Sequence, residues 1–268
     1  MTVHTEMGRD VTVLEQQVVT RAVGAVSLRG VTKRFGDGPN VLEDVSLDVA
    51  EGEFVCLLGA SGCGKSTLLN LAAGLDQPTA GTVEVPGVRA ALMFQEPALF
   101  PWLTASQNVE LALRLCGVGR RDRRARAAEL LELVRLRGAG TKRVHELSGG
   151  MRQRVAMARA LAQDSPVLLM DEPFAALDAI TRDVLHEELV RIRESQKLTV
   201  LFVTHNVREA VRLGDRVVLL SSRPGRIAKD YPVQIAHPRR IEAPEVARLS
   251  MEITDDLRTE IRRHGGQA

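Results

Sequence analysis

The chain is poor in aromatic residues, cysteine and long apolar runs, and each shortage excludes a class of protein. Aromatic residues make up only 3% of the 268 positions. The three cysteines, Cys56, Cys63 and Cys116, have neither paired nor metal-ligand spacing, which argues against a disulfide framework or a zinc site and favours a reducing compartment. No apolar run reaches the ~18 residues of a membrane span, and residues 1–10 lack the pattern of a signal peptide. We therefore expect any membrane role to come through a partner.

The chain also lacks an excess of either charge. Its 36 basic and 34 acidic residues give a formal net charge of +2, which provides no electrostatic footprint for nucleic acid. The hydrophobic share of 44% is enough for an ordinary globular core. The length fits one large domain or two modest ones. We expect a globular protein with no nucleic-acid partner.

One glycine-rich stretch has the spacing of a phosphate-binding loop, in which Gly and four residues precede Gly-Lys-Ser. It lies between a strand-like apolar run at 53–58 and a helix-forming run at 67–73, so a chance match is disfavoured. Glycines let backbone N–H groups turn toward a phosphate, and the helix start adds unpaired N–H groups. The lysine can reach the β- and γ-phosphates, and the serine hydroxyl can ligate Mg²⁺. The candidate residues are Gly59, Ala60, Ser61, Gly62, Cys63, Gly64, Lys65, Ser66 and Thr67.

Two carboxylates end another apolar, strand-like run at 167–170. Asp171 and Glu172 follow it directly, and successive side chains on a strand point to opposite sides. Asp171 therefore fits a role beside magnesium in a phosphate-loop enzyme. Glu172 can orient or deprotonate an attacking water. The alternative is that both residues are solvated acids at the end of a strand. The presence of a phosphate loop in the same chain disfavours this alternative.

Two further strand-like runs end in polar side chains. Gln95 follows the run at 90–94, and His205 follows the run at 199–203. Ligand groups in parallel sheets gather beyond the carboxyl ends of the strands. Gln95 is thus either a contact for a metal or water or a surface residue that opens a loop. A lone histidine is usually structural, but its position favours His205 as a contact near the γ-phosphate.

A second candidate anion site lies at the start of a helix-forming run at 151–162. Ser148, Gly149 and Gly150 precede this run. A helix cap alone explains Ser-Gly-Gly, so the motif gains its value only from the carboxylates that follow it in the chain.

The remaining segments suggest the domain plan. Residues 1–24 are expected to form a poorly ordered leader. Alternation at 26–35 and 41–49 predicts an antiparallel β layer. Phe35 ends the first of these strands, where it either stacks on adenine or is an ordinary strand-end aromatic, and composition favours the latter. Residues 97–163 are mostly helical and include a Phe-Pro-Trp cluster at 100–102, which is either a small local core or a docking surface.

Together these motifs resemble the ATP-binding subunit of ABC transporters over about residues 26–226. Within that family, the stretches 99–104, 174–182 and 222–227 look like those of importers of sulfonates, taurine or nitrate. They separate subfamilies but not substrates. The motifs that appear in the family's order are 59–66, Gln95, 147–153, 170–173 and His205.

The resemblance implies an α/β fold: a P-loop NTPase core with a mainly parallel sheet, an N-terminal antiparallel β layer and an inserted α-helical subdomain at about 97–163. It implies an ATPase domain at 25–241. A C-terminal amphipathic helix at 242–268 is predicted separately, from apolar residues that recur at steps of three and four: Val246, Leu249, Ile253, Leu257 and Ile261.

The resemblance also implies transport-coupled ATP hydrolysis with Mg²⁺, by a homodimer in which Lys65 of one copy and Ser148 and Gly150 of the other enclose each ATP. Its partners would be integral membrane permease subunits and a separate solute-binding protein. The protein would be located at the cytoplasmic face of the cell membrane. The alternative is a soluble ABC ATPase that acts as an assembly scaffold. The implied roles are catalysis for Glu172, His205 and Gln95, metal contact for Ser66, Gln95 and Asp171, adenine stacking for Phe35, and a contact across the dimer for Asp178.

Overall fold

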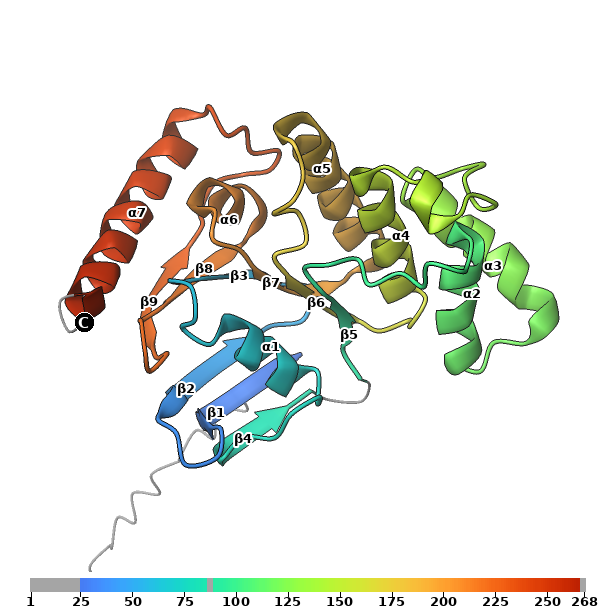
Figure 1. The fold of residues 1–268 in the computed structure, drawn as a ribbon. Coiled ribbons are helices and arrows are strands. Elements are labelled where there is room, and N and C mark those ends of the chain that lie inside the picture. The colour runs from blue at the N-terminus through green and yellow to red at the C-terminus, as the bar shows by residue number, and fades with distance from the viewer. Residues whose placement is uncertain (1–24, 86–88, 266–268) are drawn as a thin grey trace, which may run out of the picture.

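A six-stranded sheet forms the centre of the protein (Figure 1). The structure is a computed structural model that describes residues 25–85 and 89–265. The strand order is β5-β6-β7-β3-β8-β9, parallel except for β9, which pairs antiparallel with β8. The inner strands are almost wholly buried, as expected of a parallel sheet covered on both faces. The strands are β3 (Phe54–Leu58), β5 (Ala91–Met93), β6 (Val167–Asp171), β7 (Thr199–Val203), β8 (Arg216–Leu220) and β9 (Ile227–Pro232).

A second, antiparallel sheet has the order β2-β1-β4 and lies at the bottom of Figure 1. Its strands are β1 (Val26–Arg34), β2 (Asn40–Val49) and β4 (Ala80–Glu84). Helix α1 (Lys65–Ala72) lies between the two sheets and contacts strands of both. The apolar faces of β1, β2 and α1 share one buried cluster with β3 and β7. The helix that follows the phosphate loop is thereby fixed on both sides.

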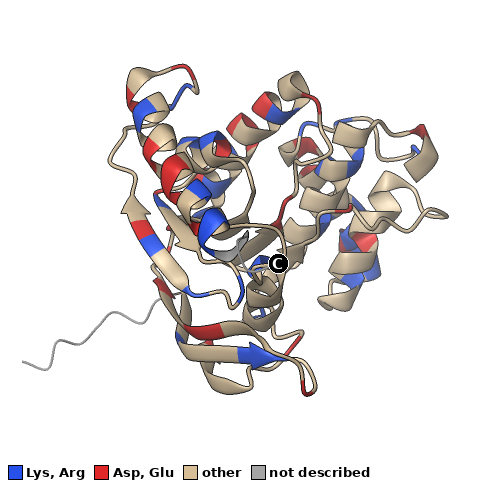
Figure 2. Cartoon of the chain, turned by 60° about the vertical axis from the view of Figure 1, so that its left-hand side comes forward, with Lys and Arg blue, Asp and Glu red and all other residues tan. Residues whose placement is uncertain are grey.

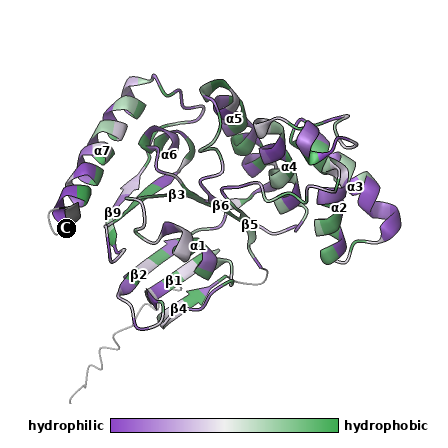
Figure 3. Cartoon of the chain, in the orientation of Figure 1, coloured by the Kyte–Doolittle hydropathy of each residue, from purple (hydrophilic) through white to green (hydrophobic). Residues whose placement is uncertain are grey.

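The other helices divide into two groups. Helices α2, α3 and α4 form a bundle to the right in Figure 1, while α6 packs on β3 and β8 and α7 packs on the outer side of α6. The outer end of α3 is hydrophilic in Figure 3, and Figure 2 shows both signs of charge interspersed over the helices. No helix in the described ranges is long and apolar enough to cross a bilayer. The bounds are α2 (Ala105–Leu115), α3 (Arg120–Leu133), a short 3-10 helix η1 (Val144–Glu146), α4 (Gly149–Leu161), α5 (Ala179–Gln196), α6 (Val207–Leu213) and α7 (Pro244–Gly265).

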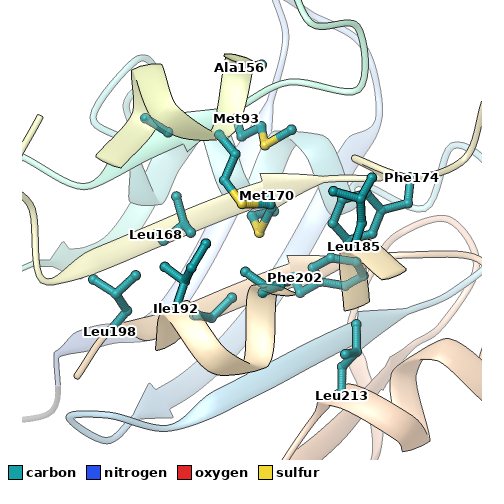
Figure 4. Packing of buried hydrophobic residues seen from close by; sticks show 14 of the residues in the cluster. Met93, Ala156, Leu168, Met170, Phe174, Leu185, Ile192, Leu198, Phe202 and Leu213 are labelled. Carbon is teal, nitrogen blue, oxygen red and sulfur yellow. The ribbon is translucent and has the colours of Figure 1, made fainter. Parts of the chain in front are cut away.

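The core under the large sheet is mainly aliphatic, as the low aromatic content requires. Three of its rings gather at one point, where Phe202 packs 5.8 Å from Phe54 and 5.9 Å from Phe174 between ring centroids. Figure 4 shows Met93 and Met170 beside this cluster, and both methionines are fully buried. Phe174 comes three residues after the end of β6, so the packing anchors the segment that carries the two carboxylates.

The fold class predicted from the sequence is confirmed, with differences in detail. Strand β9 was not predicted, because most of its residues are exposed on an edge strand and show no apolar alternation. In α7, Val246 and Ile253 are fully buried, whereas Ile261 near the end of the stripe is 46% exposed. The predicted leader at 1–24 lies outside the described residues.

Candidate nucleotide site

The glycines of the phosphate loop are required by its shape. Gly62 and Gly64 adopt φ of 75° and 100°, in the left-handed region that side chains disfavour. A Cβ on Gly64 would lie 2.6 Å from Leu42 Cδ2, so β2 blocks any side chain there. Gly64 is also the N-cap of α1, which leaves the first N–H groups of the helix free for an anion.

Lys65 is folded back over this loop. Its side chain is buried, and Nζ donates hydrogen bonds to the carbonyls of Gly59 at 2.8 Å and Ala60 at 3.0 Å. Within the described ranges the ammonium has no carboxylate partner, so its charge is available to an anion. In the remainder of the predicted loop, Ser61 and Ser66 are exposed, Thr67 is half-buried and Cys63 is buried.

Ser66 and Asp171 meet at the head of α1. Asp171 ends β6, and its carboxylate lies close enough to the Ser66 side chain for the two to interact. Burial raises the pKa of Asp171, the nearby Ser66 side chain opposes the rise, and the charge on Glu172 adds to it. Hydroxyl and carboxylate oxygens suit Mg²⁺, which takes one or two protein ligands and completes its shell with phosphate and water. Across the described chain no cluster of three or more acidic, His or Cys side chains would hold a metal unaided.

Gln95 does not join this pair. Its side chain is exposed and makes no hydrogen bond among the described residues. Its backbone carbonyl, in contrast, accepts a hydrogen bond from Gln153 Nε2 at 3.1 Å. Gln153 and Arg159 both lie on α4, and Arg159 donates to the carbonyls of Pro97 and Ala98 at 2.7 and 2.6 Å. Helix α4 therefore holds the first part of the loop, residues 95–98.

Glu172 and His205 form the second contact at the strand ends. Glu172 Oε2 lies 2.8 Å from His205 Nδ1. Glu172 has a φ of 43°, uncommon for a residue other than glycine, and its N–H donates to Val203 O at 2.9 Å. Backbone strain of this kind concentrates at functional sites. The turn directs the carboxylate out of the strand path and toward His205.

A buried polar network supports the His205 loop, and no motif in the sequence predicted it. His186 Nε2 lies 2.7 Å from Glu209 Oε1, and Thr204 Oγ1 donates to Glu209 Oε2. His186, Thr204 and Glu209 are each at most 6% exposed. Asn206 caps α6 with its side chain. Thr204 and Asn206, which flank His205 in the chain, are thus both held by hydrogen bonds.

The Ser-Gly-Gly motif starts α4, away from the phosphate loop. Ser148 is the N-cap and accepts a hydrogen bond from Met151 N at 3.2 Å. A Cβ on Gly150 would lie 2.6 Å from Thr181 Cγ2, so a side chain there would force Thr181 to shift. Gly149 is exposed. Asp178 caps α5 through Thr181 N at 3.0 Å, a bond that lowers the pKa of Asp178.

Two separate hollows result. One is lined by Ser148, Gly150 and Thr181, and it shares no residue with the hollow next to the phosphate loop. The second, of about 540 Å³, lies between Phe35 and Gly62. Phe35 is 53% exposed, and Lys33 Nζ lies 4.7 Å from the centre of its ring. The chain thus carries two candidate phosphate sites that line different hollows.

Comparison with known proteins assigns this geometry to a family. A family model described as ABC transporter matches residues 42–175. A taurine import ATP-binding protein, TauB of Sinorhizobium fredii, is 50% identical over 210 residues, which cover 76% of this chain and 79% of that protein. The chain belongs to the ABC transporter family. It is an ABC-type ATPase of the kind that drives transport.

Other members of the ABC family are similar to this chain in sequence or in fold. An aliphatic sulfonates import ATP-binding protein, SsuB 1 of Mesorhizobium japonicum, is 48% identical and covers 87% of this chain and 88% of its own length. A solved dimeric structure of the bacterial ABC transporter cassette MJ0796 superposes with a TM-score of 0.70 at 35% identity, over 79% of this chain and all of that one. A second dimeric MJ0796 structure, in a post-hydrolysis state, is bound to ADP and Pi, with a TM-score of 0.69 at the same identity and coverage.

Proposed function

We propose that this ABC ATPase works as a homodimer that binds two ATP and powers the import of a small anion of the sulfonate, taurine or nitrate class. The observation that carries the proposal is the separation of the two hollows. In one chain the phosphate loop and the Ser148 motif line different hollows that share no residue, so we expect a second copy to complete each site. Import of taurine and aliphatic sulfonates is named for relatives that are 48–50% identical.

In the proposed site, Lys65 and the free N–H groups of α1 bind the β- and γ-phosphates. Ser66, Asp171 and Gln95 would hold Mg²⁺, which would supply neutralisation of the charge on the phosphate oxygens. Phe35 stacks on the adenine, since an exposed ring beside an open hollow offers a flat apolar face.

Hydrolysis depends on the Glu172–His205 pair. Glu172 accepts a proton from the attacking water or orients it, and its contact with His205 Nδ1 at 2.8 Å keeps the carboxylate aimed beyond the strand end. His205 in turn contacts the γ-phosphate. Ser148, Gly149 and Gly150 of the second copy close the site from the other side with the helix start of α4. Asp178 lies in the same region and contacts the partner.

Coupling to a membrane partner is assigned to the loop whose first part α4 holds. Trp102 is 67% exposed and packs 5.5 Å from Phe100 between ring centroids. Asn108, fully buried, fixes this loop through the N–H and carbonyl of Phe100. An exposed aromatic pair on a rigid support suits an interface. We propose that it docks on permease subunits at the cytoplasmic face of the membrane, with a separate solute-binding protein on the other side.

The test is uptake and membrane association in cells that lack the native gene. Wild-type protein should restore uptake of labelled taurine or an alkanesulfonate and should co-purify with a polytopic membrane protein from detergent-solubilised membranes. Trp102→Ala should lose both while the purified protein keeps its ATPase activity. Leu115→Ala removes another exposed apolar side chain of the same helical group and should change neither. Recovery of the wild-type protein only with soluble partners would replace the importer by the scaffold function.

A further inference from the structure

The turn at 221–226, which connects β8 to β9, packs directly on the phosphate loop. Gly225 N donates to Val41 O at 2.9 Å, and Glu43 N donates to Gly225 O at 3.0 Å, so the turn pairs with β2. A Cβ on Gly225 would lie 2.1 Å from Cys63 O, within the phosphate loop. There is no room for a side chain between the two segments. The turn is therefore held at a fixed position against the nucleotide site.

This packing places the guanidinium of Arg223 beside Gly62. A Cβ on Gly62 would lie 2.9 Å from Arg223 Nη2 and 3.6 Å from its Cζ. Arg223 and Pro224 line the same hollow as Phe35 and Gly62. The arginine thus lies between the ring proposed to bind adenine and the loop proposed to bind phosphate, and its side chain is exposed to the open space.

Arg223 also differs in its partners from the other cations near this hollow. Lys33 is paired with Asp76 at 2.6 Å, and Arg226 is paired with Glu43 at 2.9 Å. Arg223 has no ion pair and no hydrogen bond within the part of the chain that the structure describes. Its charge is therefore not neutralised within the described chain, although Glu43, which lines the same hollow, pairs with Arg226.

We propose that Arg223 is an additional nucleotide-binding residue, which contacts the phosphate chain of the bound nucleotide from the side opposite Lys65. The inference rests on the proposed binding of ATP at this site. A guanidinium is planar and always charged, and it binds phosphate oxygens through two parallel N–H bonds. The turn at 221–226 fixes the backbone position from which this side chain reaches toward the phosphate loop.

The experiment compares the binding of Mg-ADP and of adenosine to the purified full-length protein by calorimetry. Arg223→Gln should raise the Kd for ADP about fivefold, the size expected of an exposed charge pair, and should leave the Kd for adenosine unchanged. The loss should shrink at high salt, because screening weakens the contact in the wild type. Arg223→Lys, which keeps the charge but not the planar fork, should lie between. Arg121→Gln removes one charge from the exposed side of α3 and should bind ADP as the wild type does.

The outcomes separate the two proposals. A wild-type protein that does not bind ADP would contradict the proposed function itself. A wild type that binds ADP while Arg223→Gln and Arg223→Lys bind it equally well would overturn the role of Arg223. Equal losses for ADP and adenosine would also overturn it, because they would assign the contact to the base or the ribose. Unfolding temperatures of the variants should match that of the wild type, since Arg223 has no partner in the described chain to lose.

Discussion

Replacement of Glu209 by alanine should damage both stability and turnover. Glu209 accepts from Thr204 and contacts His186, and its own side chain is 6% exposed. The substitution leaves two buried polar groups without their partner, and each such group costs about 1–3 kcal/mol. We expect the free energy of unfolding to fall by about 2–5 kcal/mol, a large part of the total for a typical domain. Denaturant titration followed by circular dichroism measures it.

The effect on turnover follows from the position of His205. It lies between Thr204, which Glu209 fixes, and Asn206, which caps α6. When Thr204 is released, the 2.8 Å contact between His205 and Glu172 should loosen. Small displacements of catalytic groups lower rates by tenfold to a hundredfold. We expect kcat to fall at least about tenfold with little change in nucleotide binding, because the phosphate loop is not touched.

Two controls make this result decisive. Glu209→Gln keeps one acceptor and adds a donor at the same place, so it should retain most of the stability. Glu187→Ala removes an exposed carboxylate from α5 and should change stability by less than about 0.5 kcal/mol. The prediction is refuted if the free energy of unfolding of Glu209→Ala lies within about 1 kcal/mol of the wild-type value and the variant hydrolyses ATP at the wild-type rate.

The remaining predictions concern the carboxylates and the thiols. Glu172→Gln should lower the rate of phosphate release by about a hundredfold or more and keep ATP binding, and near-normal hydrolysis would remove Glu172 from the role of base. Burial raises the pKa of Asp171, so the native state holds its proton more tightly than the unfolded chain does and stability is lost as pH rises through the native pKa. In the absence of Mg²⁺ and nucleotide, Asp171→Asn should therefore raise the unfolding temperature at pH 7. It should have no such effect at a pH below the ordinary aspartate pKa of about 3.9. An unchanged unfolding temperature at pH 7 would contradict this prediction. Cys116 is exposed whereas Cys63 is buried with a raised pKa, so mass spectrometry after brief alkylation should find the label on Cys116, and equal labelling would show that the phosphate loop opens.

The sequence predicted the parts of the site that are built from short, local motifs. The phosphate loop between a strand and a helix depends on neighbouring residues, and Asp171 follows from a buried strand that ends in acids. Both could be inferred because spacing alone carries the chemistry. The parallel core likewise follows from apolar runs that alternate with helical segments.

The network beneath His205 could not be predicted in this way. His186 and Glu209 are 23 residues apart and lie on two amphipathic helices, where polar residues are expected to face solvent. Only the folded structure shows that both face inward. Arg223 lies in a stretch that the sequence marked as typical of a subfamily, and its position beside Gly62 depends on the pairing of the turn with β2.

The central claim is that each ATP site is shared by two copies of the chain, with the phosphate loop from one and Ser148 from the other. Sedimentation of the Glu172→Gln protein with and without Mg-ATP tests it most directly. The account predicts a monomer without ATP and a dimer with it, and a return to monomer when Ser148→Arg is added, although ATP still binds. An ATP-dependent dimer that forms equally well with Ser148→Arg would contradict the shared site.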